Sequence, residues 1–507
     1  MRRIAYLSPL NPAPSGISDY SEELLPYLAR YGEITLYVDE GLKPSNPDLA
    51  RHLDVRPIRK LERDHRRRPY DAILYHMGNS PVHAGIWRAM RRVPGILVLH
   101  EFVLHHFMLN YAATVRRNVE EYRAEAAQRY GAEGERVANF MLHGRFTEAA
   151  FDLPFCEPVL DAAEGLIAHS RYVLDRVAAL RPALPAAHVS MGVPLPPLIP
   201  REAARARRGL PAGAPILASF GHINPYKRLN AVFRALRVLR EVYPALRYLL
   251  VGSVSPNYDV RAVVTRAGLD EVVMITGYVD RAAFEEYVAA ADICLNLRHP
   301  TAGETSASLL RLLGAGRPAL VTASGSFAEL PPDVAAQVDA DASEGDLIAA
   351  YCRLLLDRPE LAAALGVSAR AYVAREHTLE GAAAGYVRFL STRYGWGEIS
   401  RPRTGPLWEP RSDDRRKGTI YRAPTNDDRP LSVLGGQLQR TTDNRQQTTD
   451  NLQSAICNLQ SAVAEALAGL GVTEDDGPLL EGTARGLAEL FRTSPQSPAA
   501  PDRSSDT

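Results

Sequence analysis

The sequence predicts an α/β protein with two tandem parallel sheets and a tail of different composition. Two series of alternating strands and helices support this prediction, one from residue 3 to about 180 and one from residue 215 onward. Such alternation favours parallel sheets joined by crossover helices. A proline-rich run, Pro194–Pro200, separates the two series and is typical of a linker. We therefore expect two Rossmann-like domains facing a cleft, where ligands commonly bind.

Composition places the chain among ordinary globular proteins. Hydrophobic residues make up 46% and charged residues 23% of the 507 positions, and the formal net charge is zero. Zero net charge gives no indication of nucleic acid as a partner. The four cysteines are scattered without metal-ligand spacing, which indicates reduced thiols of a cytoplasmic protein. No apolar run is long enough for a signal peptide or a bilayer span, so any membrane contact would be peripheral.

The first series begins with a buried strand at 3–9, a turn-rich loop and a helix at about 18–30. Gly16 stands where the loop enters this helix, and its lack of a side chain would let the backbone approach a ligand. A plain turn glycine is the alternative. A helix-rich insertion at 116–150 is expected to pack over the sheet edge. The other expected strands and helices of this series lie at 33–38, 71–76, 82–92, 95–100, 165–170 and 172–180.

Polar residues follow two of these strands at the point where each strand ends. The segment ILYHMGNS brings His76 and Asn79, and the segment ILVLHEF brings His100 and Glu101. Ligands of open α/β sheets bind at the carboxyl ends of the strands. His100 is therefore as consistent with chemistry as with packing, whereas His76 favours a structural role.

The second series begins with the strand in ILASFGHINPYKR, followed by a glycine and a loop. This loop brings Lys227 to the start of a helix at about 229–242. A lysine at such a junction is usually a solvated charge. Here it would stand at the same sheet edge as the helix that begins near Ser306, where both would bind a diphosphate and stabilise it as a leaving group.

The stretch 296–322 is expected to form a strand end, a loop, a helix, a turn and a strand. Thr305 or Ser306 would cap the helix, whose apolar positions include Leu309 and Leu313. The N-terminus of such a helix offers unpaired N–H groups and the positive end of the dipole, which favour phosphate. Most capped helices bind nothing, so the rest of the chain has to support this interpretation.

These segments together resemble the family 4 glycosyltransferases, which are retaining enzymes of the two-domain GT-B fold. The resemblance covers roughly residues 1–395 and depends on four motifs in matching order and spacing. They are SPLNPAPSGISDYSEELLPYL, then FGHINPYKR followed by a helix and YLLVG, then MITGYV, and finally the stretch 296–322 with its GAGRPALV. It implies an acceptor-side domain at 1–195, a nucleotide-sugar domain at 196–378, and a helix at 379–395 that crosses back.

The resemblance also implies roles for individual residues. His100 would lie near the transferred sugar, Lys227 would bind the diphosphate, and Glu304 lies in the loop that contacts sugar and phosphates. We expect these three to be the catalytic residues, and the backbone near Tyr278 to contact the base. The complete set of expected donor-binding residues is Gly16, His222, Lys227, Arg228, Tyr278, Gly303, Glu304, Thr305 and Ser306.

Two departures from the family pattern concern this site. Family members usually carry two glutamates with seven residues between them; here those places fall at Gly303 and Arg311, and only Glu304 is acidic. The second glutamate normally holds the ribose, so Arg311 is expected to pack or to bind phosphate instead. His222 occupies the place of the family's arginine, and Arg228 would supply the missing charge. These changes mark either a subfamily or a weakened enzyme.

The implied reaction transfers a sugar from a nucleoside diphosphate sugar to an acceptor hydroxyl with retention. The acceptor would be a glycan, a lipid-linked glycan or a small molecule. We expect no cofactor and no metal: Asp339 and Asp341 form an Asp-x-Asp, but turn and cap roles suffice for them. The alternatives are a catalytically weakened transferase-like binding protein and an enzyme of another class on the same architecture, namely a sugar-nucleotide epimerase or a phosphorylase.

The remaining features concern the tail and the surface. Residues 396–507 are expected to be a largely disordered, low-complexity tail with near-repeats and short helical segments. The run RDHRRRP at 63–69, with Arg88, Arg91 and Arg92, forms a basic cluster. A solvated surface explains it best, and contact with anionic lipid at the inner membrane of the cell is the alternative.

Overall fold

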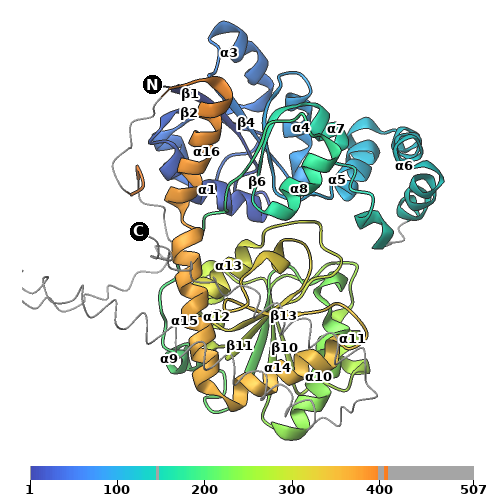
Figure 1. Cartoon of the computed structure of the whole chain (residues 1–507), viewed down its shortest axis with the longest axis vertical. Helices are drawn as coiled ribbons and strands as arrows, with labels where there is room; N and C mark the ends of the chain where they lie inside the picture. The colour runs from blue at the N-terminus through green and yellow to red at the C-terminus, as the bar shows by residue number, and fades with distance from the viewer. Residues whose placement is uncertain (1, 144–147, 398–404, 409–507) are drawn as a thin grey trace, which may run out of the picture.

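The computed structural model describes residues 2–143, 148–397 and 405–408. Within these residues the chain forms two α/β units stacked along the long axis of the molecule (Figure 1). The first sheet has seven strands in the order β3-β2-β1-β4-β5-β6-β7, and the second has six in the order β10-β9-β8-β11-β12-β13. The strand pairs of both sheets are parallel, which confirms the predicted class of two Rossmann-like domains. The predicted tail lies almost entirely outside the described residues.

The first domain has helices on both faces of its sheet. Its strands are β1 (Arg2–Leu7), β2 (Gly32–Val38), β3 (Asp54–Pro57), β4 (Ala72–Met77), β5 (Gly95–Leu99), β6 (Ala163–Ala168) and β7 (Ala186–His188). Its helices are α1 (Gly16–Leu28), α2 (Pro47–His52), α3 (Leu61–Arg67), α4 (Ala84–Met90), α5 (His105–Asn110), α6 (Val119–Leu142), α7 (Glu157–Asp161) and α8 (Arg171–Leu180).

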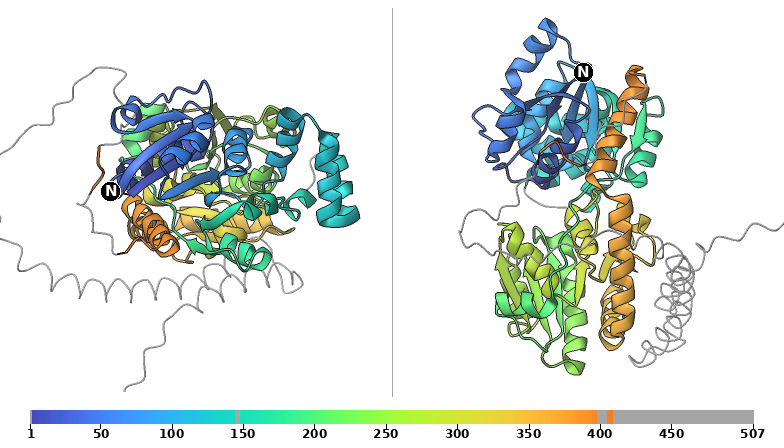
Figure 2. Two further views of the ribbon diagram at one scale, coloured as in Figure 1. Left: turned by 90° about the horizontal axis from the view of Figure 1, so that it is seen from above. Right: turned by 90° about the vertical axis from the view of Figure 1, so that its left-hand side faces the viewer.

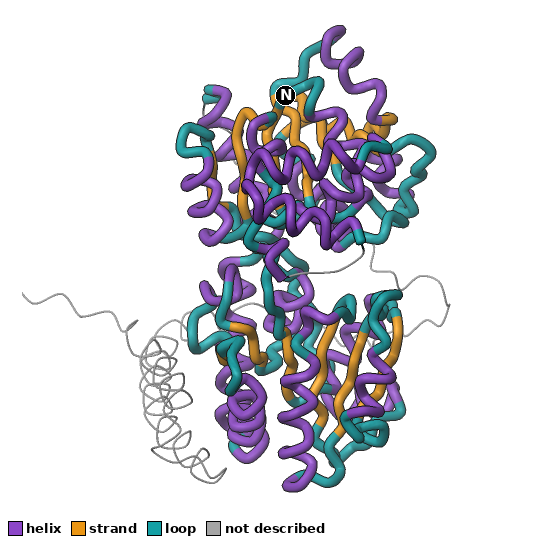
Figure 3. Tube along the Cα trace, turned by 90° about the vertical axis from the view of Figure 1, so that its right-hand side faces the viewer, coloured by secondary structure: helices purple, strands orange, loops and turns teal. Residues whose placement is uncertain are grey.

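The second domain repeats this layered arrangement, as the tube in Figure 3 shows. Its strands are β8 (Ile216–Phe220), β9 (Arg247–Val251), β10 (Val273–Gly277), β11 (Ile293–Asn296), β12 (Ala319–Thr322) and β13 (Ala336–Val338). Its helices are α9 (Arg201–Arg208), α10 (Leu229–Val242), α11 (Val260–Arg266), α12 (Arg281–Ala290), α13 (Ala307–Gly314), α14 (Glu344–Asp357) and α15 (Pro359–Glu376), and α16 (Leu379–Tyr394) follows.

The central strands are nearly continuous apolar runs because both faces of each sheet are covered by helices. All residues of β4, β5, β8 and β11 are buried. In each sheet the chain order reverses beside the first strand, at β1 and β4 in the first domain and at β8 and β11 in the second. Open sheets of this kind bind ligands at the carboxyl ends of the strands next to this reversal.

Helix α16 leaves the second domain and packs on α1 of the first. Figure 2 shows α15 and α16 running along one side of both domains. The hydroxyl groups of Tyr20 and Tyr386 lie 3.2 Å apart at this contact. Gly385 lets α16 also lie close to Val189, because a Cβ there would come within 2.6 Å of that side chain. Further along, Trp408 stacks on His52 with ring centroids 4.7 Å apart.

The 18-residue helix α15 and several shorter elements were not among the predicted ones, namely β3, β7, α2, α3, α5, α7 and α9. The predicted helix-rich insertion at 116–150 contains α6, which is kinked at Gly131, where φ is 64°. Cys156, Cys294 and Cys352 are buried free thiols. Among the described residues, none of the helices combines the length and the apolar character needed to span a membrane.

Candidate active site between the facing sheet edges

Lys227 lies at the carboxyl end of β8, in a short turn of 3-10 helix that Asn224 caps. Its Nζ donates a hydrogen bond to the carbonyl oxygen of Phe220 at 2.7 Å, and the residue is 3% exposed. A Cβ on Gly221 would lie 3.8 Å from this Nζ and 3.6 Å from Oγ of Ser308. The ammonium group therefore stands beside the first turn of α13, so the structure brings together the lysine and the helix start that the sequence analysis paired.

The loop before α13 is held by its own side chains. Arg298 forms an ion pair with Glu304, and Oγ1 of Thr301 donates to Oε2 of Glu304 at 3.1 Å. Ser306 is the residue that caps the helix, accepting the N–H of Leu309 at 3.2 Å. The loop thus places Glu304, which is 6% exposed, under the arginine and close to Lys227.

We call Lys227, Arg298 and Glu304 the Lys227 cluster. Among the described residues, Lys227 makes no ion pair with a carboxylate, because Glu304 is taken by Arg298. Burial lowers the pKa of Lys227 to about 7, and the charge of Arg298 lowers it further, while Glu304 opposes the shift. An anion placed beside Nζ would restore the charged lysine. With Lys227 protonated, the cluster therefore has one cation more than it has anions.

The two domains meet at this loop. Ala302 accepts backbone hydrogen bonds from the N–H groups of Phe102 and Val103, at 2.7 and 3.0 Å. Oγ1 of Thr305 donates to the carbonyl oxygen of His169 at 3.2 Å. Gly303 has a φ of +80°, and a Cβ there would lie 2.9 Å from Cβ of Phe102. Only glycine fits this close approach, which is why Gly303 stands where the two sheet edges touch.

Residues 200–372, which hold the Lys227 cluster, match a family model described as glycosyl transferases group 1. We call this part of the chain the group 1 domain, after the description of the family that it matches. A longer part of the chain is similar to D-inositol 3-phosphate glycosyltransferase of Streptomyces scabiei (strain 87.22), with 27% identity over 423 residues, covering 73% of this chain and 87% of that protein.

Two solved structures share the arrangement of both domains. Sucrose-phosphate synthase from Thermosynechococcus elongatus has a TM-score of 0.56 at 17% identity, covering 78% of this chain and 100% of that chain. Anabaena Alr3699/HepE, solved in complex with UDP and glucose, has a TM-score of 0.54 at 15% identity, covering 77% of this chain and 100% of that chain. At these identities the likeness shows the GT-B fold and nothing finer.

Opposite the group 1 domain, Glu101 follows strand β5 and is partly buried. Its carboxylate accepts the backbone N–H of Asn79, whose own side-chain oxygen accepts the N–H of Phe107 at 2.8 Å. Burial raises the pKa of Glu101 to about 7, and the charge of Glu304 raises it as well. The sequence analysis quoted this residue without assigning it a role, although its place at a strand end was the available signal.

His100 and His76 belong to a buried histidine group that also contains His169. Nδ1 of His76 and Nε2 of His100 lie 2.9 Å apart, and the rings of His100 and His169 have centroids 4.9 Å apart. Burial lowers the pKa of all three, so they are neutral at pH 7. His100 is 5% exposed and contacts Tyr20 rather than the Lys227 cluster. The histidines pack beneath the sheet edge, with Tyr20 and Tyr386 around them.

Three predicted donor residues lie at the rim of the facing edges. Gly16 is the first residue of α1, and a Cβ there would meet no atom within 4 Å. Nδ1 of His222 forms a hydrogen bond with Oγ of Ser253 at 3.0 Å. Burial lowers the pKa of His222, and the charges of Lys227 and Arg298 lower it further, so His222 lies near the cluster. Tyr278 follows β10 and is 82% exposed.

Arg228, expected to supply charge at the donor, and Arg311, expected to pack or to bind phosphate, are not brought to the Lys227 cluster. Arg228 pairs with the fully buried Glu344 of α14, with its Nε 2.9 Å and its Nη2 2.6 Å from Oε2. Arg311 of α13 pairs with Glu23 of α1, its Nη2 lying 2.8 and 2.9 Å from the two carboxylate oxygens. Each guanidinium is directed to a carboxylate from a distant part of the chain, which sequence spacing could not reveal.

Other predicted features have local structural roles. Asp341 accepts the N–H of Ser343 at 2.9 Å and its hydroxyl at 2.6 Å, which is the expected turn role. In the basic cluster, Arg63 pairs with Asp64 and Arg66 pairs with Glu62 on α3.

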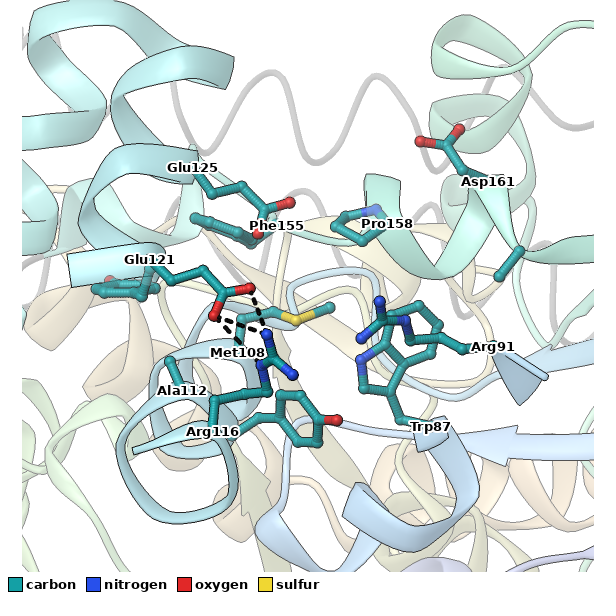
Figure 4. A pocket seen from close by; sticks show the side chains of 13 residues that line it. Trp87, Arg91, Met108, Ala112, Arg116, Glu121, Glu125, Phe155, Pro158 and Asp161 are labelled. Atoms are coloured by element: carbon teal, nitrogen blue, oxygen red, sulfur yellow. Dashed lines mark hydrogen bonds and ion pairs between the residues drawn. The ribbon is translucent and has the colours of Figure 1, made fainter. Parts of the chain in front are cut away.

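A separate pocket of about 350 Å³ lies in the first domain, between α4, α5, α6 and α7 (Figure 4). Arg116 and Glu121 form an ion pair on one wall, and the guanidinium of Arg91 stands 5.8 Å from the ring centre of Trp87 on the other. Met108 lies between these walls. This pocket shares no lining residue with the Lys227 cluster.

Proposed function

We propose that this protein is a retaining glycosyltransferase that moves a sugar from a nucleoside diphosphate sugar to an acceptor hydroxyl. The observation that supports this most is the buried, uncompensated charge of Lys227 beside the first turn of α13, inside the group 1 domain. A buried cation without a carboxylate partner is costly unless an anion joins it. A diphosphate is an anion of the right charge and it would also meet the N-terminal end of α13.

The chemistry requires stabilisation of the departing diphosphate. Lys227 and Arg298 would supply positive charge at the oxygen from which the sugar leaves, and the low-dielectric surroundings would strengthen their effect. With two cations at this place, we propose a reaction without a metal or a cofactor. The first domain would hold the acceptor against the donor, because the two sheet edges touch at Ala302 and Gly303.

The acceptor is proposed to be a carbohydrate, a lipid-linked glycan or a small polyol phosphate such as D-inositol 3-phosphate, after which the curated relative is named. We propose a cytoplasmic enzyme in which the basic cluster at 63–69 is a solvated surface, since Arg63 and Arg66 already pair with Asp64 and Glu62.

One observation favours the second candidate, a weakened transferase that binds the donor without turnover. Arg311 stands where the family's ribose glutamate is expected, and it is held by Glu23. The two candidates predict the same donor binding and differ in product release.

The test is a thermal-shift screen with UDP-glucose, UDP-N-acetylglucosamine, GDP-mannose and ADP-glucose, followed by release of the nucleoside diphosphate. A donor present at about 100 times its dissociation constant stabilises the folded state by about 2.7 kcal/mol and raises the melting temperature. We expect one donor to raise the melting temperature, and we expect its nucleoside diphosphate to be released when acceptor is added. Binding without release across an acceptor panel would favour the second candidate, and no shift with any donor would contradict both.

A further inference from the structure

Glu101 lies at the point where the first domain meets the loop of the Lys227 cluster. The next residue, Phe102, donates its N–H to the carbonyl oxygen of Ala302 at 2.7 Å, and Ala302 is two residues before Glu304. The charges of Glu304 and Arg298 both act on the carboxyl group of Glu101. A side chain from the first domain therefore reaches the place where the proposed function puts the donor's reacting end.

The carboxylate is fixed from its own side. Oε2 accepts the N–H of Asn79 and lies near Gly78 and His83, since a Cβ on Gly78 would be 3.4 Å from Oε2 and 3.2 Å from Nε2 of His83. Among the described residues, Oε1 of Glu101 has no hydrogen-bond partner. One oxygen is thus anchored while the other is left to accept a proton or a hydrogen bond.

We propose that Glu101 is the proton acceptor of the transfer reaction, an inference that depends on the proposed function. The acceptor oxygen bonds to the anomeric carbon on the face from which the diphosphate leaves, as retention requires, and its proton moves to Oε1 of Glu101. The bond between the anomeric carbon and the diphosphate oxygen breaks, and its electron pair leaves with the diphosphate beside Lys227 and Arg298. The protonated Glu101 then returns its proton to solvent. The reacting group of the acceptor is therefore a neutral hydroxyl group.

The surroundings suit this role. General bases work best when their pKa lies near the operating pH. Burial raises the pKa of Glu101 to about 7; Glu304 raises it too, whereas the hydrogen bond from Asn79 and the charge of Arg298 oppose the rise. The other titratable groups near it are His83, His100 and His106, which contacts the side chain of Asn79, and burial keeps all three neutral at pH 7. With the donor bound, the diphosphate keeps Lys227 protonated, so Glu101 is the group expected to titrate there.

The experiment compares Glu101→Gln with the wild-type protein at a saturating donor concentration. The donor is UDP-glucose, unless another donor of the panel gives a larger thermal shift than UDP-glucose does. The acceptors are water, D-inositol 3-phosphate and 4-nitrophenol, and release of the nucleoside diphosphate is measured between pH 5.5 and 8.5. Glutamine still accepts the N–H of Asn79 but cannot take a proton. We expect turnover with water and inositol phosphate to fall about 10²- to 10⁴-fold, with donor affinity unchanged. The rise of the wild-type rate through pH 7 should disappear in the variant.

4-Nitrophenol separates a chemical role from a structural one. This phenol is substantially ionised at neutral pH and needs no base, so the variant should approach the wild-type rate with it. Glu101→Asp, which keeps a carboxylate, should retain the rise with pH even if Glu101→Gln folds poorly. Glu62→Gln on the surface of α3 is the matched control and should change nothing.

The inference is overturned if Glu101→Gln keeps more than a third of the wild-type turnover with water and inositol phosphate, or keeps the rise through pH 7. Equal losses with all three acceptors would also overturn it, because they would indicate a structural role. A wild-type protein that binds no donor, or that binds one and releases no diphosphate, would instead contradict the proposed function itself.

Discussion

Two groups of charges lie where the two domains meet, and they differ in how their charges balance. The first is the Lys227 cluster. The second, which we call the Glu23 cluster, contains Glu23 of α1, Arg281 and Glu285 of α12, and Arg311 of α13. Nη1 of Arg281 donates to Glu23 at 2.7 Å and its Nε donates to Glu285 at 3.1 Å. The Glu23 cluster has two cations and two anions, whereas the Lys227 cluster has two cations and one anion.

The difference indicates which group awaits a ligand. In a balanced, hydrogen-bonded set of charges each charge has a partner, so removing one member leaves an unpaired charge behind. An unbalanced set is already short of a partner, so removing its extra cation relieves a cost rather than creating one. We therefore expect the Glu23 cluster to hold the domains together, and the Lys227 cluster to act on the donor.

Lys227→Met should produce the largest effect on function and almost none on stability. Transfer activity should fall by about 10²- to 10³-fold, the usual loss when one charge-stabilising group is removed. The free energy of unfolding should change by less than about 1 kcal/mol, because the lost hydrogen bond to Phe220 and the relieved burial of a cation oppose each other. Diphosphate release and thermal denaturation measure the two quantities.

Lys43→Met, at an exposed lysine of the first domain, is the control and should leave both quantities unchanged. A Lys227→Met protein that unfolds several kcal/mol more easily would show that Lys227 is part of a balanced structural set. The comparison between the two clusters would then fail.

Glu23→Gln should show the opposite pattern. The free energy of unfolding should fall by about 2 to 3 kcal/mol, near the lower end for a broken buried ion pair, because Arg281 is partly exposed. Glu62→Gln on α3 breaks an exposed pair with Arg66 and should cost less than about 0.5 kcal/mol. Denaturant unfolding measures both variants.

A double-mutant cycle identifies the partner of Glu23. If the pair with Arg311 is real, Glu23→Gln together with Arg311→Met should cost less than the sum of the single changes. Strict additivity would show that the two side chains do not interact.

The sequence was informative where structure is local. The helix over 229–242, the cap at Ser306 and the strand ends that carry His100 and Lys227 follow from hydrophobic periodicity and capping rules. Short edge strands such as β7, with three residues, give no periodicity to detect.

Partners far apart in the chain could not be predicted in the same way. Glu23 looks like any carboxylate on an amphipathic helix, and its partner Arg311 lies 288 residues further along. The same holds for Arg228, whose partner Glu344 is 116 residues away. The raised pKa of Glu101 likewise depends on burial by both domains, which the sequence alone does not give.

Arg228 and Glu344 extend the comparison to a balanced pair within the second domain. Arg228 has a φ of 57°, a left-handed conformation that costs a residue with a Cβ about 1 kcal/mol. Arg228→Ala and Arg228→Gly both lose the pair with buried Glu344, but only glycine relieves the backbone. We expect the glycine variant to be more stable than the alanine variant by about 0.5 to 1 kcal/mol, the exact gain being reduced by the freedom of glycine in the unfolded chain.

The same two variants test whether Arg228 contacts the donor, as the sequence predicted, or only Glu344, as in the structure. Because its guanidinium is directed to Glu344, both variants should bind the panel donor with an affinity within about threefold of wild type, which is less than about 0.7 kcal/mol. Calorimetry on the folded proteins measures this affinity. A tenfold or greater loss in both variants would instead place Arg228 at the donor, as the sequence predicted, and would add a third cation to the Lys227 cluster.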